Sequence, residues 1–236
     1  MNEQKLKRRI NFLTYYLVVS SVAFITAIVW IYKNSEPQEN FDVLNVKRLN
    51  IVDETGTNLR MVISNESRQH SGIINGDKLP ERERPSGIIF FNSFGDECGG
   101  LVYDGNEKDA GMVLSVDKFR DDQIMQLQYM ENTKNHNRKY GLQLWDYPKE
   151  NTFEERNNRF NGMENLETDL EKKQAYQKMK TDSLLMEDRL FIGKGFNKDV
   201  GLFINDKEGN PRIKIYVDSE DNPRIEILDK EGEIIR

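Results

Sequence analysis

Two histidines and one cysteine are the side chains of this sequence best suited to bind a metal or to act as a nucleophile. His70 and His136 are the only histidines, and neither has a His, Cys or Glu at the spacing of zinc or iron sites. Cys98 is the only cysteine; we expect it in a Cys98-Gly99-Gly100 turn, and no pattern brings it to a histidine. The Gly-x-Ser-x-Gly, Gly-x-Gly-x-x-Gly and Gly-Lys-Ser/Thr sequences are missing as well. We therefore predict no metal, no cofactor and no catalytic residue.

Carboxylates are the second group that could carry chemistry. A pair of them can act as acid and base in glycoside cleavage. Two sets lie close enough in the sequence to supply such a pair, namely Asp96 with Glu97, and Asp117 with Asp121 and Asp122. Solvated turn and strand-edge residues are the simpler interpretation. The alternative is an envelope enzyme that acts on polysaccharide or peptidoglycan through paired carboxylates.

Aspartates also open short turns that have glycine at the fourth position, as in residues 53–56 and 206–209. Such turns look faintly like calcium loops. A calcium loop, however, needs alternating oxygen ligands and a closing glutamate. We expect each aspartate to cap its own turn instead, and calcium binding is the weaker interpretation.

Aromatic side chains offer a binding surface without catalysis. Most aromatic residues of a domain belong to its core. Near residues 90–103 and 145–147, however, they could line a surface that binds a glycan or a peptide. The candidate binding residues are Phe90, Phe91, Tyr103, Trp145 and Tyr147.

Short segments of alternating apolar and polar residues, separated by polar turns, must position these side chains. The pattern is typical of antiparallel strands and is clearest at the C-terminus, where Asn-Pro-Arg recurs at 210–212 and 222–224. There Ile213, Ile215 and Val217 fall on one face of the expected strand. Such a sheet buries one face only, so another layer or another chain must cover that face.

Residues 151–189 interrupt the strand pattern. Thr152 with Glu155 and Thr168 with Glu171 both fit a capping box at a helix start, and Gly162 lies where the first helix could end. We therefore predict a helical hairpin inserted between β-rich residues 47–150 and a C-terminal β-repeat at 190–236. The predicted fold class is mainly β, an N-terminal transmembrane helix followed by an antiparallel β-repeat domain arranged as a meander, sandwich or solenoid.

The N-terminus predicts a membrane anchor. No charged residue lies between Arg9 and Lys33, and those 23 positions span about 34 Å as a helix, enough for a bilayer core. We predict a cytoplasmic tail at 1–9, a transmembrane helix at 10–32 and a linker at 33–46. A cleaved signal peptide is the alternative, but its apolar stretch would be shorter.

Charge gives the expected orientation and partners. Lysine and arginine cluster before the predicted span, which favours a cytoplasmic N-terminus in the inner or plasma membrane and an exterior C-terminal domain, periplasmic in a Gram-negative cell. The formal charge of the chain is −6, and no basic stripe for nucleic acid is present. The expected partners are the membrane and either further copies of the chain or another envelope protein.

Segments 49–64, 87–105 and 201–235 resemble a group of uncharacterised bacterial membrane-anchored proteins with repeated Asp-x-x-Gly turns and Arg-Ile-x-Ile strands. The resemblance covers most of 47–146 and 190–236, and implies a bacterial origin and a β-architecture, with no function attached. From the anchor and the repeated strands, we expect a non-enzymatic cell-envelope module for binding or assembly.

Overall fold

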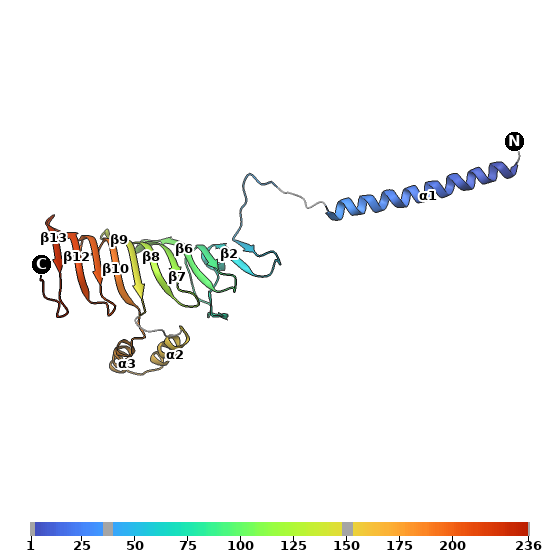
Figure 1. Cartoon of the computed structure of the whole chain (residues 1–236). Coiled ribbons are helices and arrows are strands. Elements are labelled where there is room, and N and C mark those ends of the chain that lie inside the picture. The colour runs from blue at the N-terminus through green and yellow to red at the C-terminus, as the bar shows by residue number, and fades with distance from the viewer. Residues whose placement is uncertain (1–2, 35–39, 148–152, 236) are drawn as a thin grey trace. The chain divides into compact units, whose positions relative to one another are not determined.

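The computed structural model describes residues 3–34, 40–147 and 153–235 (Figure 1). The chain divides into two compact units, Met1–Asn45 and Val46–Arg236. The first unit contains one helix, and the second contains all the strands and the two shorter helices.

Helix α1 (Glu3–Asn34) is long and apolar enough to cross a membrane. Its polar side chains bond within the helix: the hydroxyl of Thr14 donates to the carbonyl of Ile10, and that of Thr26 donates to the carbonyl of Val22, both at 2.9 Å. A hydrocarbon core offers no water to these groups, so such internal bonds suit a spanning helix. The predicted span 10–32 lies wholly within α1.

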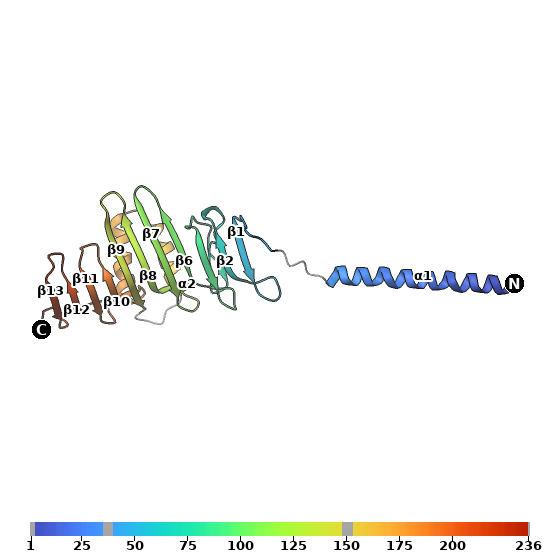
Figure 2. The same cartoon turned by 90° about the horizontal axis from the view of Figure 1, so that it is seen from above.

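The second unit is built on one sheet of eleven antiparallel strands, which lie side by side in chain order (Figure 2). The strands are β1 (Arg48–Val52), β2 (Leu59–Ser64), β5 (Gly87–Phe91), β6 (Glu97–Gly105), β7 (Asp109–Asp117), β8 (Gln123–Asn132), β9 (Asn137–Asp146), β10 (Glu187–Lys194), β11 (Val200–Asn205), β12 (Pro211–Val217) and β13 (Pro223–Ile227). The mainly β fold class is confirmed, and its arrangement is that of a meander.

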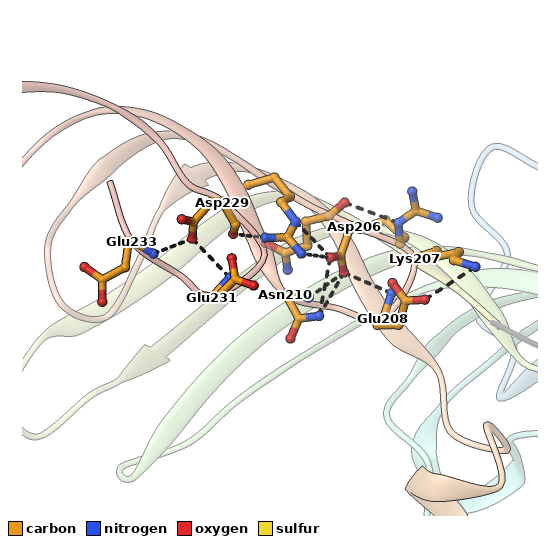
Figure 3. Close-up of polar contacts among 10 residues, drawn as sticks. Asp206, Lys207, Glu208, Asn210, Asp229, Glu231 and Glu233 are labelled. Carbon is orange, nitrogen blue, oxygen red and sulfur yellow. Dashed lines mark hydrogen bonds and ion pairs between the residues drawn. The ribbon is translucent and has the colours of Figure 1, made fainter. Parts of the chain in front are cut away.

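Polar turns connect the strands, and their aspartates are bonded as the sequence predicts. In the turn between β11 and β12, a carboxylate oxygen of Asp206 accepts from the backbone N–H groups of Glu208 and Asn210, at 3.0 and 2.9 Å (Figure 3). The other oxygen of Asp206 accepts from the Nε of Arg212 at 2.9 Å. The turn after β13 repeats the backbone bonds at Asp229. Each aspartate therefore caps its own turn.

The connection between β2 and β5 contains the 3₁₀ helix η1 (Glu66–Arg68) and a separate two-stranded ribbon, β3 (Ile73–Ile74) with β4 (Asp77–Lys78). The ring of His70, in this connection, packs edge-to-face on Phe91, with centroids 4.9 Å apart. The backbone N–H of Gly76 donates to Asp96 at 2.7 Å. The connection therefore covers one face of the sheet, where Val62, Ile89 and Phe91 form a small core.

Helices α2 (Phe153–Glu164) and α3 (Asp169–Thr181) form the inserted pair between β9 and β10, as predicted. The capping box of Thr168 and Glu171 is present at the start of α3. Thr152 lies outside the described residues. The expected helix end at Gly162 is wrong, because α2 continues through this residue to Glu164. A glycine inside a helix costs only about 1 kcal/mol, which the neighbouring helical residues offset.

Candidate functional site

The register of the sheet places leucine or isoleucine at one facing position of every strand. Directly facing residues of neighbouring strands lie on the same side of a sheet, so these positions form one line across all eleven strands. This central row consists of Leu49, Ile63, Ile88, Leu101, Leu114, Leu127, Leu142, Ile192, Leu202, Ile215 and Ile225.

Two further rows flank the central row on the same face, since side chains two residues apart along a strand point the same way. The second row consists of Ile51, Met61, Phe90, Gly99, Val116, Met125, Leu144, Leu190, Ile204, Ile213 and Ile227. The third row, on the last eight strands, consists of Tyr103, Met112, Tyr129, Tyr140, Lys194, Val200, Val217 and Pro223. We call the surface formed by the three rows the open face. Lys194 is its only charged residue.

The open face is not buried within the second unit. Leu127 in the middle of the central row is 48 % exposed, and Ile225 at its end is 67 % exposed. In the two complete rows, Gly99 is the only buried residue. Helices α2 and α3 lie on one side of the sheet in Figure 1, and Figure 2 views the sheet from the opposite side with the helices behind it. Monomeric soluble proteins rarely expose a contiguous apolar surface of this extent.

The opposite, covered face is more polar. Gln128 and Gln143 are buried there, and the Nε2 of Gln143 donates to the carboxylate of Asp188 at 3.1 Å. An aromatic ladder of Phe191, Phe203 and Tyr216 crosses β10, β11 and β12, with successive ring centroids 6.1 and 5.6 Å apart. Phe191 and Phe203 border a cavity of about 370 Å³. The sequence did not predict this ladder, although its three members are spaced 12 and 13 residues apart, as the strand repeat is.

The five predicted binding residues do not gather at one place. Phe90 and Tyr103 lie on the open face, in the second and third rows. Phe91 is buried against His70. Trp145 follows Leu144 and points to the other side of β9. Tyr147 lies beneath the Arg156 guanidinium, which is 4.2 Å from the centre of its ring.

His70 and Cys98, two of the three side chains considered for metal or nucleophile chemistry, lie in environments that disfavour their charged forms. The Nδ1 of His70 accepts from the backbone N–H of Gly72 at 2.9 Å. Burial, and then the charges of Arg48 and Lys78, lower the pKa of His70 and keep the ring neutral. Burial, and then Asp117, raise the pKa of Cys98, so the thiol stays protonated. The turn expected at Cys98 is wrong: the residue lies within β6, where Glu97 and residues 99–102 pair with β5 and residues 99–105 pair with β7.

Most of the carboxylates considered for acid–base chemistry are held by cations. Glu97 accepts two bonds from the guanidinium of Arg84, at 2.7 and 2.9 Å. Asp121 pairs with the buried Arg156. Asp96 is almost fully buried, and its carboxylate lies 3.3 Å from the Nε of Arg120. The same carboxylate also accepts the hydrogen bond from Gly76 in the 66–86 connection. These contacts join the turns, the connection and α2 to the sheet.

Asp117 at the end of β7 differs from these carboxylates. Burial, then the charges of Glu97 and Asp122, raise its pKa to about 7. Its Oδ1 atom is buried and has no hydrogen-bond partner among the described residues. A carboxyl group with a pKa in this range can exchange a proton near neutral pH.

Comparisons with known protein families, with curated proteins and with solved structures found no match to this chain. Its function therefore has to be argued from its surfaces, and the open face is one that the sheet itself leaves uncovered.

Proposed function

We propose that this chain is a single-pass membrane protein of the bacterial cell envelope, and that its β-domain binds or assembles through the open face without enzymatic activity. The observation that carries the proposal is the central row, which presents leucine or isoleucine on eleven consecutive strands and stays largely exposed. Apolar side chains at every facing position are typical of a surface that is covered when the protein works.

The positive N-terminal flank supports a cytoplasmic N-terminus and an exterior β-domain. Lys5, Lys7, Arg8 and Arg9 precede the apolar part of α1, whereas Lys33 alone follows it before the acidic residues of the linker. Protease added to intact spheroplasts should digest the β-domain and leave a membrane-embedded N-terminal fragment. Digestion only after lysis would contradict this orientation.

A photo-reactive residue tests whether the open face is the binding surface. Leu127 and Met130 lie on the same strand and are similarly exposed, at 48 % and 40 %, but point to opposite faces. With benzoyl-phenylalanine at either position of the full chain in cells, we expect adducts from position 127 and few from position 130. Equal labelling, or labelling from position 130 alone, would contradict the proposal.

The second candidate function is an enzyme that acts on polysaccharide or peptidoglycan, and the raised pKa of Asp117 next to Glu97 is the observation that favours it. Incubation of the purified chain with peptidoglycan, followed by analysis of released fragments, tests this alternative. Fragments that appear with the natural chain and disappear with Asp117→Asn would support an enzyme. Our first proposal expects no release from either protein.

A further inference from the structure

The open face needs a partner that is flat, apolar and as wide as the whole sheet. We infer that this partner is a second copy of the chain, anchored in the same membrane and packed face to face, with β1 of one copy over β1 of the other. The inference rests on the proposed function, because it names the occupant of the same face.

The size of the open face suits a pair of copies. Strands lie about 4.8 Å apart and alternate residues of a strand about 6.8 Å apart, so the two complete rows cover roughly 700 Å². Two such faces together would bury about 1,400 Å², within the range of roughly 1,200–2,000 Å² that stable protein interfaces show. Two sheets pack face to face about 10 Å apart, and side chains such as Leu127 and Ile192 would fill that space. A second open face matches the first in both width and chemistry.

Charge speaks against a lipid surface as the occupant. Residues 1–45 hold five of the 34 cationic and four of the 40 acidic residues, so residues 46–236 carry a formal charge of −7. Anionic lipid headgroups repel such a domain, and surfaces that lie on membranes are usually rimmed by lysine and arginine. The turn between β11 and β12 carries Asp206 and Glu208 with one cation, Lys207, and the turn after β13 carries Asp229, Glu231 and Glu233 with Lys230 alone, so acidic residues outnumber lysines in both.

The anchors select the orientation of the pair. A two-fold axis that packs one face on itself lies between the sheets, and if the strands of the two copies are to be aligned it runs roughly parallel either to the rows or to the strands. An axis parallel to the strands places β1 over β13 of the other copy, and the two points at which the linkers enter then lie roughly 50 Å apart. An axis parallel to the rows places β1 over β1, so both copies enter the pair from the same end. A shared membrane favours this second arrangement because it holds both anchors at one end.

The two orientations differ in which residues face themselves. The central row lies in the middle of the three rows, so with an axis parallel to the rows each of its members faces its own counterpart. The second row of one copy then faces the third row of the other, and both are apolar except for Lys194. With an axis parallel to the strands, only the middle strand β8 faces its own counterpart.

Cysteine cross-linking of the full chain in native membranes tests the inference. In a Cys98→Ser background, Leu127→Cys places a thiol at the middle of the central row and Ile225→Cys places one at its end. Met130→Cys and Arg224→Cys are matched controls on the same two strands, exposed but on the covered face. With a short bismaleimide, we expect covalent dimers from both open-face variants and none from the controls. Adding Leu127→Glu to the Ile225→Cys chain should abolish its dimer, because the change places a charge at the centre of the interface.

The other outcomes separate the inference from the proposed function. Dimers from Leu127→Cys alone would overturn the β1-over-β1 arrangement. No dimer from either variant, combined with photo-adducts of position 127 to a different protein or to lipid, would overturn the second copy and leave the open face as a binding surface. Absence of both dimers and adducts, from a variant that unfolds at the same urea concentration as the natural chain, would overturn the inference and the proposed function together.

Discussion

At the scale of single residues, the strand-connecting turns depend on one backbone position with positive φ. Gly209 and Gly232 occupy it in two of the turns, with φ of 80° and 87°, whereas Lys198 occupies it between β10 and β11 with φ of 74°. A residue with a Cβ atom pays about 1–2 kcal/mol in this conformation. We therefore expect Lys198→Gly to raise the free energy of unfolding by about 1 kcal/mol, measured by urea denaturation of the full chain in detergent.

The reverse substitution provides the control. A Cβ atom built on Gly232 meets no heavy atom within 4 Å, so Gly232→Ala changes the backbone preference without a clash. It should lower the free energy of unfolding by a similar 1 kcal/mol or so. If both substitutions left the free energy of unfolding unchanged, the residue type at the position with positive φ would not affect the stability of these turns.

Asp117 should make stability depend on pH. Its folded-state pKa is raised to about 7, so its stabilising contribution is complete below the unfolded value near 4 and is lost as the pH rises through 7. Asp117→Asn removes this loss. We expect the variant to gain stability over the natural chain between pH 4 and pH 8, by no more than about 4 kcal/mol.

Asp218 should make stability depend on pH in the opposite direction. Hydrogen bonds, first from the backbone of Asn222, lower its pKa to about 2, so its contribution is present above pH 4 and is lost as the pH falls toward 2. Asp218→Asn should therefore lose its destabilising effect in acid, whereas the gain from Asp117→Asn grows toward alkaline pH. Parallel pH profiles for the two variants would contradict both assignments.

At the scale of elements, the helical pair provides a local test of stability. Gly162 lies inside α2, and a Cβ atom there meets nothing within 4 Å, so Gly162→Ala should stabilise the helix by about 1 kcal/mol. Thr168→Ala removes the capping box of α3 and should cost about 1 kcal/mol. Amide hydrogen exchange measured within 153–181 reports both changes. Unchanged protection in both variants would mean that packing against the sheet alone controls the pair.

The elements also show how much the sequence could predict. Alternation along Ile213, Ile215 and Val217 predicted their shared face, and the Thr168 box predicted the start of α3, because both signals lie within a few residues. The continuous rows could not be predicted in the same way, since they depend on the register between strands that lie far apart in the chain. Nor did the sequence predict that Phe91 packs on His70, a contact that the irregular connection creates.

At the scale of the whole molecule, the proposed pair joins two apolar faces while bringing two acidic domains together. Each domain carries a formal charge of −7, whereas the three rows of the interface hold a single charged residue per copy, Lys194. Repulsion between the domains is therefore screened by salt, and the apolar contact between them is not weakened by it. We expect association to strengthen as ionic strength rises from about 0.01 M to 1 M, a range over which the Debye length falls from about 30 to 3 Å.

Energy transfer between donor- and acceptor-labelled full chains, reconstituted at low density in neutral lipid vesicles, measures this dependence. Transfer should rise with salt for the natural chain and stay at the level of random proximity for Leu127→Glu at every salt concentration. A decrease with salt would show that ion pairs between the copies, rather than the leucine and isoleucine rows, hold the pair together. In that case the acidic turns of one copy would have to meet cations of the other. That result would also rule out an arrangement in which each member of the central row faces its own counterpart.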